Sequence, residues 1–225
     1  MRKLHILCEG QTEWTIGRDV LEPHFTSNDT YVVSTMLTTG RDRGGRPYKG
    51  GVSKWSRIQA EIHKLLKDSS LTVLTTLLDF YAIPRDTPGL ADLPSGSHRD
   101  RVEHVERALA ASVGDPRFLP YLVLHEIEAW VLACPDELGV VTNDSRIAGQ
   151  VRALVERAGG PESVNDGPST APSKRLKHIY PMYHKVAHGP QAVELAGLDR
   201  VRRQCPHADA WFRAVDDRLG IQRTG

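Results

Sequence analysis

The sequence has few cysteines, no long apolar run and no excess of charge of either sign. The three cysteines, Cys8, Cys134 and Cys205, have no paired spacing and predict reduced thiols, which excludes a disulfide-stapled scaffold. No apolar stretch approaches the ~20 residues that cross a membrane, and the apolar run that follows Met1 is too short for a signal peptide. We therefore expect a cytoplasmic protein that has no membrane partner.

The near balance of charge limits what the surface as a whole can attract. The chain has 29 Lys and Arg residues and 28 Asp and Glu residues, so its net charge is +1 and any surface for a polyanion has to be local. Its 225 residues, 40% of them hydrophobic, are enough for a real core. This length predicts one α/β domain, or a domain of roughly 130–150 residues with a helical appendage.

Four β-rich runs alternate with helical patterns in the first part of the chain. The predicted strands are 4–8, 31–37, 71–78 and 118–124, and the predicted helices are 14–21 (closed by Pro23), 55–66, 101–113 and 129–133. Such alternation predicts an α/β fold whose mostly parallel four-stranded sheet has helices on both faces.

Beyond about residue 144 the sequence shows no strand pattern. Helices are predicted over 147–158, 173–187 (broken near Pro181), 199–204 and 206–219. We therefore divide the chain into an α/β core over 1–140 and a helical C-terminal part over 141–225 that packs on the core.

Three of the four predicted strands end in acidic residues. Glu9 ends the first strand and Glu13 follows one helical turn later, Asp79 ends the third, and Glu126 and Glu128 follow the fourth. The carboxyl ends of parallel strands share one edge of a sheet, so these side chains are expected to converge there. Carboxylates that meet repel each other unless a cation lies between them. The pattern thus predicts a site for Mg²⁺ or Mn²⁺, which suits hydrolysis of a phosphodiester. Ordinary solvation is the alternative for any one of these acids.

Two basic segments are candidates for binding phosphate. The first is the glycine-rich stretch 38–53, and the second begins the helical pattern at 173; the candidate residues are Arg41, Arg43, Arg46, Lys49, Lys174, Arg175 and Lys185. A lysine close to a metal pair can neutralise the charge that builds on phosphorus. The alternative is that both segments are solvated surface.

Several familiar motifs are incomplete. His184 and His188 have the spacing of a metal pair, but no zinc pattern is completed around them. The segment 125–129, His-Glu-Ile-Glu-Ala, has alanine where a zincin helix has its second histidine. The glycines of 38–53 are not followed by the Gly-Lys-Ser/Thr of a phosphate-binding loop, and no GxGxxG is present after the first strand.

Segments spread along the chain resemble one bacterial family. Residues 8–13, Cys-Glu-Gly-Gln-Thr-Glu, are similar to the "EGxTE" element that opens TOPRIM-like domains of the OLD-nuclease type. Longer segments resemble a bacterial family of unknown function within that group, domain-of-unknown-function family 4276; they are 51–54, 79–89, 118–129 and 172–176. The resemblance covers nearly the whole chain. The longer segments are specific for the family, whereas the short opening element is a weak signal.

This resemblance implies a TOPRIM-like fold that uses acidic residues to hold Mg²⁺. Glu9 matches the TOPRIM glutamate, a ligand or general acid/base, and Glu13 matches the second glutamate of the OLD type, a metal ligand. Asp79 matches the first acid of the TOPRIM Asp-x-Asp. The chain departs from the pattern at the second acid, where it has Tyr81.

The missing acid and the lysine of the OLD-type site have to be found elsewhere. We infer that Glu126 or Glu128 replaces the acid. Lys174 or Lys185 corresponds to the lysine, and no local motif decides between them. The resemblance also suggests an ATPase partner and a role as the effector of an anti-phage defence module.

Together these patterns predict a Mg²⁺-dependent nuclease. Glu9, Glu13, Asp79 and Lys174 are the predicted catalytic residues, and the metal is held by the carboxylates at the strand ends. Two alternatives remain open: a non-catalytic TOPRIM-like adaptor docked on an ATPase, and a hydrolase of small nucleotides. The sequence does not separate DNA from RNA.

Overall fold

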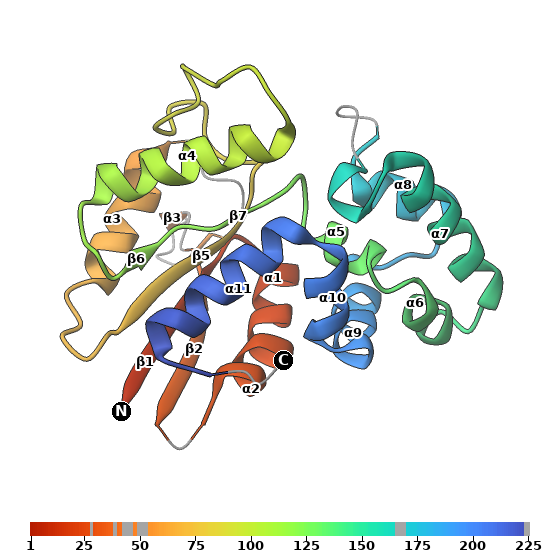
Figure 1. The fold of residues 1–225 in the computed structure, drawn as a ribbon, viewed down its shortest axis with the longest axis horizontal. Coiled ribbons are helices and arrows are strands. Elements are labelled where there is room, and N and C mark those ends of the chain that lie inside the picture. Colours follow the sequence, from red (N-terminus) through yellow and green to blue (C-terminus); the bar gives the residue numbers. More distant parts are fainter. Residues whose placement is uncertain (28, 38–39, 42–46, 49–53, 165–169, 223–225) are drawn as a thin grey trace.

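The computed structural model describes residues 1–27, 29–37, 40–41, 47–48, 54–164 and 170–222. Its main sheet has five strands in the order β2-β1-β5-β6, with β7 pairing with β5 beyond the end of β6 (Figure 1). Every pairing in this sheet is parallel; the strands are β1 (Arg2–Cys8), β2 (Thr30–Met36), β5 (Val73–Asp79), β6 (Phe118–Leu119) and β7 (Leu122–Val123). The predicted α/β class with a mostly parallel sheet is confirmed.

The centre of the sheet is its most apolar part. All seven residues of β5 are buried, as expected of a strand that is covered on both faces. β1 lies between β2 and β5, with Cys8 opposite Met36 on one side and Leu77 on the other. The carboxyl ends of β1 and β5 are therefore side by side.

The fourth predicted strand is interrupted. Between β6 and β7, Pro120 has no N–H to donate, so the ladder cannot continue through it. The next residue, Tyr121, is instead held by the side chain of Thr76 in β5. The Thr76 hydroxyl donates to the Tyr121 carbonyl at 2.8 Å and accepts from the Tyr121 N–H at 2.9 Å.

Two layers of helices cover the sheet. On one face α3 (Trp55–Leu65) and α4 (His98–Val113) bury their apolar sides. The other face is covered by the first helical segment and by α11 (Pro206–Leu219), which lies across the strands in Figure 1. The predicted helix 206–219 is confirmed as α11, and its apolar residues Trp211, Phe212, Val215 and Leu219 are all buried.

The first helical segment runs past the point where it was predicted to end. It consists of α1 (Gln11–Ile16), a π-helical turn η1 (Gly17–Leu21) and α2 (Glu22–Phe25). Pro23 lies in the first turn of α2, where its missing N–H costs little. Gly17 lets the segment approach β2 closely, because a Cβ atom there would meet the Ser34 side chain at 2.7 Å.

The C-terminal part is helical, as predicted, but is divided differently. Its elements are α5 (Glu128–Leu132), α6 (Pro135–Val141), α7 (Ser145–Ala158), η2 (Pro161–Ser163), α8 (Pro172–Ile179), α9 (Lys185–Ala196), α10 (Leu198–Gln204) and α11. The prediction missed α6 and most of α9, which contains Gly189 and Pro190 and so does not resemble a helix locally. The predicted helix 173–187 is instead α8, an irregular link and the start of α9.

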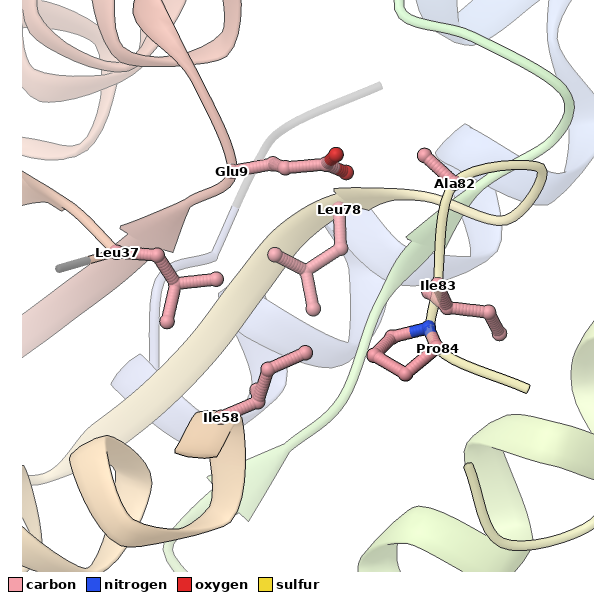
Figure 2. A pocket seen from close by; sticks show the side chains of 7 residues that line it. All are labelled: Glu9, Leu37, Ile58, Leu78, Ala82, Ile83 and Pro84. Atoms are coloured by element: carbon pink, nitrogen blue, oxygen red, sulfur yellow. The ribbon is translucent and has the colours of Figure 1, made fainter. Parts of the chain in front are cut away.

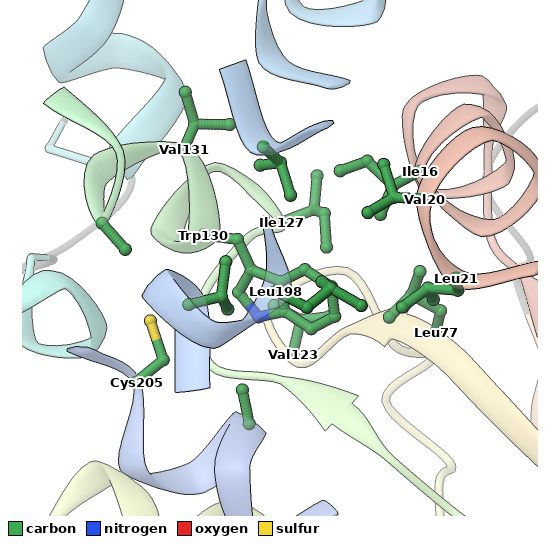
Figure 3. Packing of buried hydrophobic residues seen from close by; sticks show 14 of the residues in the cluster. Ile16, Val20, Leu21, Leu77, Val123, Ile127, Trp130, Val131, Leu198 and Cys205 are labelled. Atoms are coloured by element: carbon green, nitrogen blue, oxygen red, sulfur yellow. The ribbon is translucent and has the colours of Figure 1, made fainter. Parts of the chain in front are cut away.

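One hydrophobic cluster joins the two parts of the chain. Trp130 lies at its centre, surrounded by Ile16, Leu77 and Leu198 from elements far apart in sequence (Figure 3). Trp211 adds a hydrogen bond, because its indole N–H donates to the Thr75 hydroxyl of β5 at 2.9 Å. The C-terminal part therefore packs directly on the sheet.

Within the glycine-rich stretch 38–53, β3 (Gly40–Arg41) and β4 (Pro47–Tyr48) form a small antiparallel pair. Across the described ranges, the structure contains no helix with the length and apolar character needed to cross a membrane.

Candidate functional site

The ends of β1 and β5 and the segment that follows β7 meet at one point. The backbone N–H of Asp79 donates to Glu9 Oε2 at 3.0 Å. Asp79 Oδ1 in turn accepts the backbone N–H of Ile127 at 3.1 Å. Hydrogen bonds thus join residues 70 and 48 positions apart at the strand ends, as the strand-end pattern predicted.

Glu13 reaches the same region from the first turn of α1. Its Oε2 accepts the N–H of Gly10, the residue before the helix, at 3.0 Å. A carboxylate in this position is favoured by the positive end of the helix dipole. Only 5% of Glu13 is exposed, so its charge is directed into the protein and not into solvent.

The segment after β7 adds two more carboxylates. His125 adopts a left-handed backbone conformation with φ of 68°, which turns the chain sharply at the end of the strand. After this turn, Glu126 Oε2 accepts the N–H of Ser173 at the start of α8, at 2.9 Å. Glu128 opens α5 with an exposure of 0%, and neither of its oxygens makes a hydrogen bond to the described residues.

The carboxylates perturb one another. Burial raises the pKa of Asp79 well above its ordinary value, and the charges of Glu13, Glu9, Glu128 and Glu126 raise it further. Burial also raises the pKa of Glu9 from 4.5 to about 7, against the lowering effect of the Asp79 amide. The pKa of Glu128 rises from 4.5 to about 7, again mainly through burial, with Lys185 opposing the rise.

Lys185 supplies the positive charge that acts on this group. It begins α9, and its Nζ lies 3.8 Å from Glu128 Oε1 with 45% of the side chain exposed. Burial alone would lower the pKa of Lys185, but the surrounding carboxylates, Glu128 and Asp79 foremost, raise it above the ordinary value. We name the set Glu9, Glu13, Asp79, Glu126, Glu128 and Lys185 the carboxylate cluster.

A small apolar cavity adjoins Glu9. Its volume is only about 10 Å³, and Leu37, Ile58, Leu78 and Ile83 are among its lining residues. Figure 2 shows the Glu9 carboxylate extending over the end of β5 toward the loop that carries Ala82. This apolar surface on one side of Glu9 is part of the reason that its charged form is disfavoured.

The donor set of the carboxylate cluster suits a hard divalent cation. Its potential ligands are all oxygens, and five carboxylates surround one amine. Both oxygens of the buried Glu128 lack a hydrogen-bond donor. As the side chains stand, however, no three acidic, histidine or cysteine residues in the described ranges are arranged to hold an ion. Backbone N–H groups hold one oxygen of Glu9, Glu13, Asp79 and Glu126.

The predicted phosphate-binding residues lie in different places. Lys174 and Arg175 are on α8, whose first turn contacts Glu126, but neither belongs to an ion pair of the described residues. Arg41 is in β3. Arg43, Arg46 and Lys49 lie outside the described residues. Of the two lysines proposed for the site, Lys185 is the one whose charge acts on the carboxylates.

Sequence reasoning missed three features of this region. It did not identify the left-handed turn at His125, although histidine is one of the residues enriched in that conformation. It also missed the Ser173 amide, which no side-chain pattern reveals. The third is Tyr183, whose buried hydroxyl has its pKa raised well above the ordinary value by burial and then by Glu128.

Comparison with known proteins identifies a family but no activity. No curated protein matches the chain, and no solved structure matches it. One family model matches residues 8–216, and its description, Domain of unknown function (DUF4276), names neither TOPRIM domains nor OLD-type nucleases. Since the match includes the strand ends, α8 and α11, the chain belongs to the DUF4276 family.

Proposed function

We propose that the protein is a Mg²⁺- or Mn²⁺-dependent phosphodiesterase that acts on nucleic acid. The observation that carries this proposal is Glu128, a carboxylate with 0% exposure and no hydrogen bond among the described residues, beside four other carboxylates and one lysine. A buried charge in such surroundings is costly unless a cation balances it. Glu9, Glu13 and Asp79 would hold the cation, with Glu126 or Glu128 in the position of the acid that Tyr81 does not supply.

A divalent cation bound here would supply an activated water and stabilise the oxygens of a phosphodiester. The chain's own residues have complementary roles. Lys185 is half-exposed at the edge of the carboxylate cluster, where its ammonium can contact a phosphate from the solvent side. Lys174 is exposed one position beyond the amide that contacts Glu126, so its amine is available to the same substrate.

A specific observation favours a second function, a non-catalytic adaptor. Glu9, Asp79 and Glu126 each accept a backbone N–H from another segment, so they also act as structural connections between β1, β5 and α8. If these acids have only this structural role, the protein would dock on an ATPase without cleaving nucleic acid. The resemblance to OLD-type proteins supports such a partner and a role in anti-phage defence under either function.

Cleavage assays with matched variants test the proposal. The wild-type protein is incubated with plasmid DNA and with RNA, in Mn²⁺ and in EDTA. Asp79→Asn should lower metal-dependent cleavage by at least ~100-fold, because even the outer neighbours of metal ligands typically contribute ~10–100-fold. Glu194→Gln, an exposed change on α9, is the control and should cleave normally.

Calorimetry with Mn²⁺ keeps binding separate from activity. We expect the wild-type protein to bind Mn²⁺ and Asp79→Asn to bind it much more weakly. A folded protein that binds no Mn²⁺ and cleaves no polymer would overturn the phosphodiesterase proposal in favour of the adaptor. Hydrolysis of free nucleotides without cleavage of polymers would assign the cluster to small substrates.

A further inference from the structure

A groove between two helices of the C-terminal part has the chemistry of a phosphate-backbone site. It lies between α7 and α8 and encloses about 650 Å³ of space that is open to solvent. Its lining combines two arginines, a histidine and an amide with an apolar floor; these residues include Arg157, Arg175, His178, Gln150, Leu154 and Ile179. Among the described residues that line it, none is a carboxylate.

The two arginines of the groove differ from two other arginines, which lie on α7. Arg146 and Arg152 of α7 are each held by an aspartate, Asp144 and Asp136. Arg157 and Arg175 form no ion pair within the described ranges, and Arg157 is exposed. Cations that the protein leaves without counter-ions are available to an external anion, and arginine suits phosphate because its fork can donate two hydrogen bonds.

The charged side chains of helix α8 are all positive. Its sequence, Pro-Ser-Lys-Arg-Leu-Lys-His-Ile, contains three cations and no acid. In a protein with a net charge of +1, this is the kind of local basic surface that binding to a polyanion requires.

Helix α8 contributes both to the groove and to the surroundings of the carboxylate cluster. The Ser173 N–H at the start of α8 donates to Glu126 Oε2 at 2.9 Å. Arg175 and Ile179 follow on the same helix, about 3 and 9 Å further along its axis at 1.5 Å per residue. A strand with one phosphate at the carboxylate cluster would therefore have its next few phosphates beside the groove, given a spacing of at least ~3.4 Å per nucleotide.

We propose that the α7–α8 groove binds the backbone of a single strand of nucleic acid next to the phosphate held at the carboxylate cluster. This inference rests on the proposed function of the cluster. Arg157 and Arg175 contact successive phosphates, and the apolar floor of Leu154 and Ile179 supports the sugars. These contacts are to the sugar-phosphate backbone and not to base edges, so binding is expected to be tolerant of sequence.

Binding measured without cleavage tests the groove by itself. A fluorescein-labelled 20-nucleotide oligothymidylate is titrated with protein in EDTA, and anisotropy is read at several salt concentrations. For Arg157→Gln/Arg175→Gln we expect weaker binding and a plot of log Kobs against log[salt] that is shallower by about 1.4, since each lost single-strand phosphate contact contributes about 0.7. The control removes two exposed charges elsewhere, Lys67→Gln after α3 and Arg203→Gln on α10, and should change the slope little.

The outcomes of this titration and of the cleavage assay distinguish the groove proposal from the phosphodiesterase proposal. If the control weakens binding as much as the groove variant, or the wild-type protein binds no oligonucleotide, the groove proposal is overturned. If binding depends on the two arginines but no Mn²⁺-dependent cleavage is found, the groove stands and the phosphodiesterase proposal falls. Equal melting temperatures of the variants establish that lost binding does not reflect lost folding.

Discussion

The burial of Glu128 makes a prediction about stability that can be tested without any substrate. Its pKa is about 7 in the folded protein and has an ordinary value of 4.5, which we take for the unfolded chain. The folded state therefore retains a proton that the unfolded state has lost between these two values. The free energy of unfolding should fall as pH rises through this interval and become level above it. Glu128→Gln removes this term, because glutamine stays neutral.

The size of the effect follows from the shift. A change of 2.5 pKa units, from 4.5 to about 7, corresponds to about 3 kcal/mol at about 1.4 kcal/mol per unit. Most of this stabilisation of the wild-type protein is lost between pH 5 and pH 8. Over that range the free energy of unfolding of Glu128→Gln should therefore rise by about 2–3 kcal/mol relative to that of the wild-type protein. In EDTA at pH 8 the variant should be the more stable protein, and near pH 5 the two should be similar.

Urea unfolding at pH 5, 6, 7 and 8, followed by circular dichroism, measures this difference. Glu194→Gln, the same change at an exposed position of α9, serves as the control. Saturating Mn²⁺ at pH 8 should then stabilise the wild-type protein more than Glu128→Gln. Parallel curves for Glu128→Gln and the wild-type protein across this pH range would refute the reasoning, because they would mean that Lys185 already neutralises Glu128.

Two further predictions concern the surroundings of the carboxylates. Lys185→Met should lower the metal-free stability at pH 8 by about 1–2 kcal/mol, between the values typical of exposed and of buried ion pairs, and should tighten Mn²⁺ binding because a like charge is removed. Urea unfolding and calorimetry measure the two effects, and unchanged or weaker Mn²⁺ binding would contradict the argument. At the left-handed residue, His125→Gly should be more stable than His125→Ala by about 1 kcal/mol, because only glycine adopts a positive φ without steric cost. Equal urea midpoints for these two variants would show that the turn relaxes.

The sequence alone determined where the strands lie and which of them end in acid. The runs before Glu9 and Asp79 are short, apolar and followed at once by a polar residue, and these local properties are enough to predict buried strands. From parallel strands it follows that the carboxyl ends share an edge, so the meeting of Glu9 with Asp79 could be predicted. The divided fourth strand could not, because its interruption at Pro120 is stabilised by Thr76 from another strand.

Only the tertiary structure decided which basic groups accompany the acids. The sequence does not separate Lys174 from Lys185, since both lie in the one predicted helix 173–187. The packing of α9 against α1 and α5 brings Lys185 to Glu128, whereas the first turn of α8 presents the Ser173 amide, and not Lys174, to Glu126. The α7–α8 groove likewise depends on the packing of one helix against another. Periodicity reports which face of an element is buried but not which element covers it, so these choices depend on packing between segments far apart in the chain.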